Sequence, residues 1–169
     1  EEGDPNEIIV TATKRAENLQ SIPISVSAIT GDTLSKSRVT QADELVTKIP
    51  NLQLTSTVGD NTPIFALRGI SMSDYSLNQA SPVATYYDEV YKGNFAFLGI
   101  ALFDLERVEV LRGPQGTLYG RNSTAGTVNF VTRKPTGEFG FRAKASLGNY
   151  DERTLNANMD LPAIGGSDS

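Results

Sequence analysis

The stretch from residue 102 to residue 132 constrains the fold of this chain more than any other segment. Residues 106–112, with the sequence ERVEVLR, alternate polar and apolar side chains in the manner of a β-strand. Gly113 and Pro114 then end the strand, because glycine is conformationally permissive and proline has no amide donor. A second strand is predicted over residues 127–132, after a connection rich in glycine. The stretch contains no constellation of catalytic residues, so it indicates a fold rather than a reaction.

Short strands and short helices alternate along residues 17–135. Further strands are predicted over residues 22–29, 52–55, 64–68 and 83–90. Tyr86 and Tyr87 fall on opposite faces of the last of these strands. Residues 33–37 favour one or two helical turns, and Thr40 fits the N-cap of a helix that ends at Ile49. This order predicts the α/β class in its α+β form, with a small mixed β-sheet and short helices.

The composition excludes several functions. The net charge of -5 at pH 7 is the opposite of the concentrated basic face that a nucleic-acid partner requires. The chain has no cysteine and no histidine, which removes thiol nucleophiles, the usual zinc ligands and the serine-protease triad. Asp104, Glu106 and Glu109 lack the spacing of a calcium loop, and we interpret them as a solvated or ion-paired face. We therefore predict no catalytic residue, no metal site and no cofactor.

The stretch 102–132 resembles the C-terminal part of the plug domain of TonB-dependent outer-membrane receptors, and the resemblance extends over residues 7–161. It implies a receptor that binds a scarce solute and gates its energised import into the periplasm of a Gram-negative bacterium. An iron-siderophore chelate is the solute most expected for the family, while carbohydrates, cobalamin and aromatic compounds use the same scaffold. The alternative is a periplasmic module that binds a signalling partner without transport. The N-terminus lacks a signal-peptide pattern, as expected for a processed protein.

A short segment rich in β-branched residues lies near the N-terminus. By the resemblance it is the TonB box, and its residues are Glu7, Ile8, Ile9, Val10, Thr11 and Ala12. An extended peptide with free backbone groups can add a strand to a partner's sheet edge, here that of the TonB C-terminal domain. The bland interpretation is a first edge strand of the domain itself. We expect residues 1–16 to be a flexible tail that faces the periplasm, separated from the plug by polar residues.

Two arginines end strands in similar contexts, Arg68 in the sequence LRGI and Arg112 in LRGP. In the resembled family, arginines at these positions pair with glutamates on the inner wall of the barrel. A guanidinium suits this role because it stays charged and can bind a carboxylate with two bonds. The plain alternative is a solvated arginine at each strand end.

Two irregular stretches, residues 72–79 and 91–97, separate the predicted elements, and loops on a rigid scaffold often carry binding residues. The resemblance places them at the extracellular end of the plug, opposite the box and the exit toward the barrel. Their aromatic residues can stack on a ligand or pack the loops on the plug. The candidate ligand residues are Met72, Asp74, Tyr75, Asn78, Tyr91, Phe95 and Phe97.

The pattern changes after residue 135. Apolar side chains occupy one parity over residues 139–147 and again over 155–161, with polar side chains on the other parity. Each segment has about the 9 to 11 residues of a membrane-spanning strand, although an amphipathic hairpin of a soluble sheet shows the same pattern. By the resemblance, residues 136–169 hold the first two strands of the outer-membrane barrel. A barrel of about 22 strands is then incomplete, so we expect the chain to be a fragment.

Overall fold

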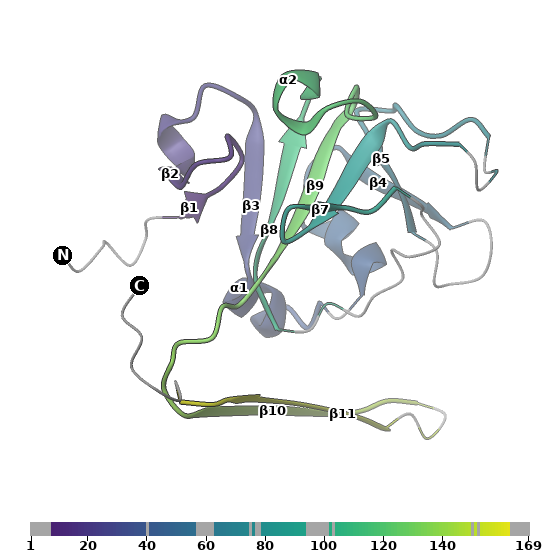
Figure 1. The fold of residues 1–169 in the computed structure, drawn as a ribbon. Helices are drawn as coiled ribbons and strands as arrows, with labels where there is room; N and C mark the ends of the chain where they lie inside the picture. The colour runs from purple at the N-terminus through teal and green to yellow at the C-terminus, as the bar shows by residue number, and fades with distance from the viewer. Residues whose placement is uncertain are drawn as a thin grey trace. The chain divides into compact units, whose positions relative to one another are not determined.

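A computed structural model describes residues 8–39, 41–56, 63–74, 76, 79–93, 102, 104–149, 151 and 153–162. The chain divides into two compact units, Glu1–Thr132 and Arg133–Ser169 (Figure 1). The described residues are mostly strands with a few short helices, which confirms the predicted fold class. None of the helices among them is long and apolar enough to cross a membrane.

The first unit is built on a mixed five-stranded sheet in the order β3-β8-β9-β6-β7 (Figure 1). Its strands are β3 (Val26–Thr30), β6 (Val83–Tyr87), β7 (Val90–Tyr91), β8 (Leu105–Arg112) and β9 (Gly126–Thr132). β6 and β9 run parallel, and the other pairs are antiparallel. The two strands predicted from residues 102–132 are therefore the central neighbours β8 and β9. Tyr86 and Tyr87 belong to different apolar clusters, so they lie on opposite faces as predicted.

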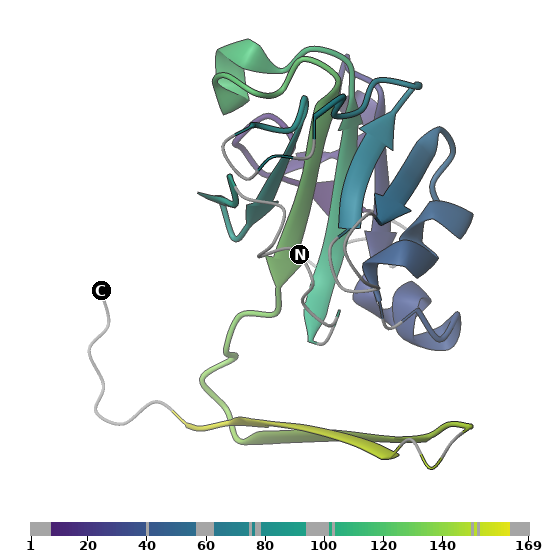
Figure 2. The ribbon, with the colours of Figure 1, turned by 90° about the vertical axis from the view of Figure 1, so that its right-hand side faces the viewer.

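One face of this sheet packs against helices and a hairpin (Figure 2). The elements on this face are α1 (Gly31–Lys36), the 3₁₀ helix η2 (Ala42–Thr47), β4 (Leu52–Ser56) and β5 (Pro63–Leu67). Leu45 and Phe65 from these elements pack against Val108, Val128 and Phe130 of the central strands. This contact is the main hydrophobic core of the unit.

The opposite face is covered by the start of the chain. β1 (Ile9–Val10) pairs with β2 (Glu17–Asn18) in an antiparallel two-stranded sheet, and a short 3₁₀ helix η1 (Leu19–Ser21) follows. The helix α2 (Gly116–Tyr119) lies in the β8–β9 connection. A second and smaller apolar cluster on this face includes Val10, Ile22, Leu111 and Tyr119.

Three elements of the first unit differ from the sequence predictions. β3 begins at Val26 rather than at residue 22, and α1 begins at Gly31, where the side chain of Thr30 accepts the amide of Thr33. A Cβ on Gly31 would come within 1.9 Å of the Leu105 carbonyl oxygen, so only glycine allows α1 to start this close to β8. The helix predicted over 40–49 is the 3₁₀ helix η2, capped by Gln41; Thr40 lies outside the described residues.

The second unit contains one antiparallel hairpin, β10 (Gly140–Leu147) with β11 (Arg153–Asp160). Phe141 faces Met159 and Ala145 faces Leu155 in the register, which places these apolar side chains on one side. The apolar side is exposed within this chain. The other side carries polar residues, and the Arg142 guanidinium lies 3.2 Å from the Asp160 carboxylate.

Candidate functional site

The N-terminal segment, which we define as residues 8–14, lies on the sheet face that carries no helix of the main core. Val10 and Ala12 have 0% exposure and pack with Leu111 and Tyr119. The amide of Leu19 donates to the Ile8 carbonyl at 2.9 Å, and the amide of Lys14 donates to the Thr11 carbonyl at 2.9 Å in a turn within the segment. The most buried part of the predicted box is therefore seated on the domain.

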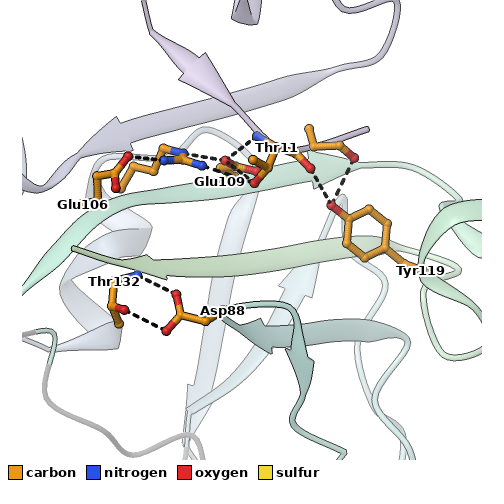
Figure 3. Close-up of polar contacts among 8 residues, drawn as sticks. Thr11, Asp88, Glu106, Glu109, Tyr119 and Thr132 are labelled. Carbon is orange, nitrogen blue, oxygen red and sulfur yellow. Dashed lines mark hydrogen bonds and ion pairs between the residues drawn. The ribbon is translucent and has the colours of Figure 1, made fainter. Parts of the chain in front are cut away.

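A buried carboxylate holds the middle of this segment (Figure 3). Glu109, with 0% exposure, accepts the Thr11 amide at 2.8 Å and the Thr11 hydroxyl at 3.1 Å on Oε1. The same oxygen accepts Arg107 Nε at 2.7 Å, and Arg107 also pairs with the carboxylate of Glu106. Charge-assisted bonds of this kind are the stronger class of hydrogen bond. Glu109 thus belongs to an ion-paired group, as interpreted from the sequence, but it is buried rather than solvated.

Tyr119 holds the next turn of the segment (Figure 3). Its hydroxyl donates to the Ala12 carbonyl at 3.0 Å, and its own carbonyl accepts the Tyr86 hydroxyl at 2.6 Å. Burial raises the pKa of Tyr119, so the hydroxyl remains a donor at neutral pH. Lys14 Nζ lies 4.7 Å from the Tyr119 ring centroid, 5.3 Å from that of Tyr86 and 3.9 Å from Glu89 Oε2. These contacts extend the attachment to β6 and its turn.

The arrangement of residues 8–14 differs from the flexible tail that was expected over residues 1–16. Polar residues follow the predicted box in the sequence, but they do not separate it from the domain. The chain turns back after Lys14, so that β2 pairs with β1, and Val10 and Ala12 fill the second apolar cluster. Glu7 lies outside the described residues, and binding of TonB by residues 7–12 stays a prediction.

Arg112 is engaged within its own unit. Its Nε donates to the Pro50 carbonyl at 3.2 Å, and its two terminal nitrogens donate to the hydroxyls of Ser25 and Ser27. These bonds fix the direction of the guanidinium at the end of β8. No local sequence pattern indicates these partners, since they lie 62 to 87 residues away along the chain.

Arg68 lies near Arg112 in space. Its backbone amide donates to the Asn51 carbonyl at 3.1 Å, next to the residue that Arg112 contacts. A Cβ on Gly113 would lie 3.9 Å from Arg68 Nη1, which places the guanidinium beside the end of β8. The side chain of Arg68 is exposed. The two predicted docking residues are therefore brought together at one end of the sheet.

The opposite end of the sheet is closed by Asp88 (Figure 3). Asp88 accepts the amide and the hydroxyl of Thr132, each at 2.8 Å, and its own amide donates to the Phe130 carbonyl. Asp88 and Glu89 form the β6–β7 turn with φ of 45° and 68°, which breaks the single strand predicted over residues 83–90. This turn clamps the end of β9, where the first unit ends.

Tyr91 lies in a β-strand rather than in the irregular stretch predicted over residues 91–97. It belongs to β7, with its ring 5.5 Å from Tyr86 and its hydroxyl accepting from Asn122 at 3.1 Å. The β6–β7 turn that precedes it lies at the exit end of the sheet and contacts Lys14 of the N-terminal segment. The two-residue turn at Asp88 and Glu89 places Tyr91 on the edge strand β7, which runs back from the exit end of the sheet, and ligand contact by Tyr91 stays a prediction.

The other candidate ligand residues differ in their exposure to solvent. Met72 is buried against Ile64, so it is not presented to solvent. Asp74 is exposed, and bonds from the hydroxyl and amide of Ser76 lower its pKa. The remaining candidates, Tyr75, Asn78, Phe95 and Phe97, lie outside the described residues.

The stretch 72–79 begins and ends at the sheet end opposite Thr132. Arg68, before the stretch, lies beside Gly113 at the end of β8. Pro82, after it, accepts the amide of Ala125 at the start of β9. The residues that flank the stretch therefore lie at the end of the sheet away from the exit, and its position at the extracellular end of the plug stays a prediction.

Sequence reasoning missed the residues that hold the N-terminal segment. Glu109 and Arg107 are two residues apart on β8, so their side chains share one face of the strand. This spacing indicates an ion pair on that face. The spacing alone does not indicate which segment covers the face. Tyr119 lies in a short helix that was not predicted. The described residues contain no cluster of acidic side chains that could hold a metal ion.

A small mixed sheet with one helical layer and a chain start seated on its other face defines a plug-type α+β domain. Residues 18–127 match the family model described as the TonB-dependent receptor plug domain, which is more than half of the chain. The chain belongs to this family, whose members are receptors and transporters rather than enzymes.

Individual relatives agree with this assignment. The chain is 34% identical over 133 residues to the pesticin receptor of Yersinia pestis, covering 78% of the chain and 19% of the relative. It is 25% identical over 153 residues to the ferric-pyoverdine 358 receptor of Pseudomonas putida, covering 90% of the chain and 18% of the relative. The chain thus spans about a fifth of the length of these curated relatives.

Solved structures show the same fold. The ferric yersiniabactin uptake receptor FyuA from Yersinia pestis superposes with a TM-score of 0.74 at 29% identity, covering 82% of this chain and 22% of that one. The alcaligin outer-membrane receptor FauA from Bordetella pertussis superposes with a TM-score of 0.72 at 22% identity, covering 91% of this chain and 26% of that one. The second comparison speaks for the fold alone.

Proposed function

We propose that this chain is the plug region of an outer-membrane receptor that binds an iron-siderophore chelate and gates its TonB-driven import into the periplasm. The family membership carries the proposal, because residues 18–127 match the plug domain of TonB-dependent receptors. Two of the relatives named above are receptors for ferric pyoverdine and ferric yersiniabactin by their own names. Carbohydrate, cobalamin or aromatic ligands are the alternatives that the same scaffold allows.

The second unit supports an outer-membrane location. Its hairpin has eight-residue strands with one exposed apolar side and one polar side. Strands that face lipid on one side and a lumen on the other show this alternation. We assign residues 136–169 to the first two strands of the barrel, residues 17–135 to the plug, and residues 1–16 to the box-containing start.

Contacts between plug and barrel fall to Arg68 and Arg112 in this proposal. Both lie at one end of the sheet, and Arg68 is exposed there. Bonds to Pro50, Ser25 and Ser27 orient the Arg112 guanidinium before any barrel carboxylate is reached. Glutamates of the barrel wall are the expected partners, because a guanidinium binds a carboxylate with directed bonds.

Ligand contact by the plug is assigned to the exposed part of residues 72–79, which is anchored away from the exit. Replacing Tyr75 by alanine in a complete receptor that carries this chain should weaken chelate binding by roughly 1 to 3 kcal/mol if its ring stacks on the ligand. Titration of the purified receptor measures this. Unchanged affinity would leave recognition to other parts of the receptor.

Growth under iron limitation tests the ligand class. A strain that lacks its own receptors and carries the complete receptor should grow on at least one ferric siderophore from a panel. Growth on none of them, together with restored growth on a carbohydrate or on cobalamin, would move the receptor to another ligand class.

Strand addition by the box is tested at Ile9, whose side chain is 42% exposed. Ile9→Pro removes a backbone donor, whereas Ile9→Ala keeps it. In the complete receptor, Ile9→Pro should abolish uptake and spare chelate affinity, and Ile9→Ala should retain most of the uptake. Equal uptake by both variants would contradict pairing of this segment with TonB.

A further inference from the structure

The last residue of the first unit is held by a carboxylate from a neighbouring turn. Asp88 Oδ1 accepts the Thr132 amide and Asp88 Oδ2 accepts the Thr132 hydroxyl, each at 2.8 Å (Figure 3). The Asp88 amide donates to the Phe130 carbonyl at 2.9 Å. Thr132 ends β9, and the boundary between the two units follows it. We call the two bonds between Asp88 and Thr132 the exit clamp.

The Asp88 carboxylate takes the place of a backbone carbonyl. β6 and β9 pair in parallel as far as Tyr87 and Phe130. In a regular parallel ladder, the residue whose amide bonds the Phe130 carbonyl would accept the Thr132 amide with its own carbonyl. Asp88 instead turns away with a φ of 45°, and its side chain accepts that amide. The exit clamp thus continues the bonding of β9 after β6 has ended.

The other side of β9 is paired irregularly at the same point. Thr132 pairs with Leu105 of β8, but the register shifts between Leu105 and Arg107. A shift of this kind is typical of a β-bulge, which locally disrupts the ladder. Asp88 therefore supplies its bonds where the regular pairing on both sides of β9 stops.

The turn that carries Asp88 has an unfavourable backbone conformation. Asp88 and Glu89 have φ of 45° and 68°, a region in which glycine is preferred. The Glu89 carboxylate lies 3.9 Å from Lys14 Nζ, and an exposed pair of this kind contributes little to stability. Strained residues persist where the surrounding structure holds them in place. At Asp88 the three bonds to Phe130 and Thr132 do so.

We propose that the exit clamp fixes the point at which the chain becomes free to move between the two units. Asp88 is then a positioning residue for Thr132, and the free link consists of residues 133–139. These residues, all within the described part of the chain, form neither helix nor strand. At about 3.5 Å per residue the link spans at most roughly 25 Å. In the proposed receptor, on which this consequence rests, the clamp limits the tether between plug and barrel.

Backbone order parameters of the 169-residue chain, measured by NMR relaxation, test the exit clamp. They should stay at about 0.85 through Thr132 and fall below about 0.6 from Lys134 onward. Asp88→Gly removes both acceptors and suits the positive φ, so relief of strain works against the expected loss of order. In this variant the fall should begin at Val131. The Thr132 amide should exchange about tenfold faster, because it loses its acceptor.

Trypsin cleavage gives a second measure of the same boundary. Cleavage after Arg133 requires unpaired chain on both sides of the bond, so its rate follows the opening of the end of β9. Asp88→Gly should raise this rate by about tenfold, whereas cleavage after the exposed Lys36 in α1 should keep its rate.

Glu89→Gly is the matched control, because it is the same substitution in the same turn and removes no bond to Thr132. It should leave the order boundary and the exchange rate unchanged. Asp88→Asn should keep most of the protection, because its amide oxygen can accept the Thr132 amide and its NH₂ group can donate to the hydroxyl. Thr132→Val removes only the hydroxyl bond and should shift both measures less than Asp88→Gly, while Thr132→Ser should shift neither.

An unchanged boundary in Asp88→Gly would overturn the inference. An equal shift in Glu89→Gly would overturn it as well, because the conformation of the turn rather than the carboxylate would then hold Thr132. If Asp88→Gly unfolded the whole unit, Thr132→Val and Thr132→Ser would decide, and equal exchange of the end of β9 in these two variants would refute the clamp. None of these measurements involves TonB or a complete barrel, so failure of the proposed receptor function would be seen separately.

Discussion

The two faces of the five-stranded sheet are covered in different ways. One face packs Val108, Val128 and Phe130 against α1, η2 and the β4–β5 hairpin. The other face carries the buried Glu109, whose carboxylate accepts the backbone amide of Thr11 in a short segment from the start of the chain. The same strands therefore form the main core on one side and hold the start of the chain on the other. The alternation of side chains along a strand makes both possible at once.

Phe130→Ala tests the apolar face and should give the largest effect. The Phe130 ring is 1% exposed, stacks on Tyr87 at 4.6 Å between centroids and contacts Phe65. Its loss should reduce the free energy of unfolding by about 3 to 5 kcal/mol in urea denaturation. Phe141→Ala, at an exposed ring of the hairpin, is the control and should change it by less than about 0.5 kcal/mol. Similar reductions of the free energy of unfolding in both variants would contradict the assignment of Phe130 to the main core and of Phe141 to an exposed face.

Arg107→Ala tests the polar face. Removing the guanidinium leaves Glu109 without its charged partner, and a charge that stays buried alone typically costs about 3 to 5 kcal/mol. We expect the segment to open in this variant and expose Glu109 to water, so the loss of global stability should be smaller than in Phe130→Ala. The hydrogen-exchange rates of the backbone amides in residues 8–14 should rise toward the rates of unprotected amides. A loss as large as that of Phe130→Ala would show that the polar face cannot open by itself.

Two tyrosine hydroxyls give the smallest and most closely matched contrast. Tyr119→Phe removes the donor to the Ala12 carbonyl and should weaken attachment of the segment by about 1 kcal/mol. The hydroxyl of Tyr87, on the other face, is buried without a partner among the described residues, and burial raises its pKa to about 12. Tyr87→Phe should therefore be neutral or stabilising in thermal unfolding. A destabilised Tyr87→Phe would mean that this hydroxyl is satisfied in solution.

The strands could be predicted from the sequence wherever their pattern is local. β8, β9 and the two strands of the hairpin follow from alternation, and Gly113 with Pro114 marks the end of β8. The break at Asp88 was missed because both turn residues adopt positive φ without the glycine or asparagine that signals such a turn. The start of α1 depends on Gly31 meeting the Leu105 carbonyl, a contact 74 residues along the chain that no local pattern reveals.

The candidate site was predictable in part for the same reason. The β-branched run at residues 8–11 identifies a strand-forming segment, but its attachment depends on Glu109 and Tyr119, 98 and 107 residues away from their partners. The local sequence around Glu109 is equally compatible with a side chain that faces solvent and with one that lies under a covering segment. Whether Glu109 faces solvent or lies under the chain start depends on two tertiary features, the pairing of β8 with β9 and the pairing of β2 with β1.

Native-state hydrogen exchange across low urea concentrations tests the contrast between the faces most directly. Amides of residues 10–14 should exchange through a local opening whose free energy does not depend on urea, well below that of β8 and β9. Amides of Val108, Val110 and Val128 should exchange only through global unfolding, with a slope equal to that of the urea transition. A single common free energy and slope for both sets of amides would contradict the account, because the N-terminal segment would then be an inseparable part of the core.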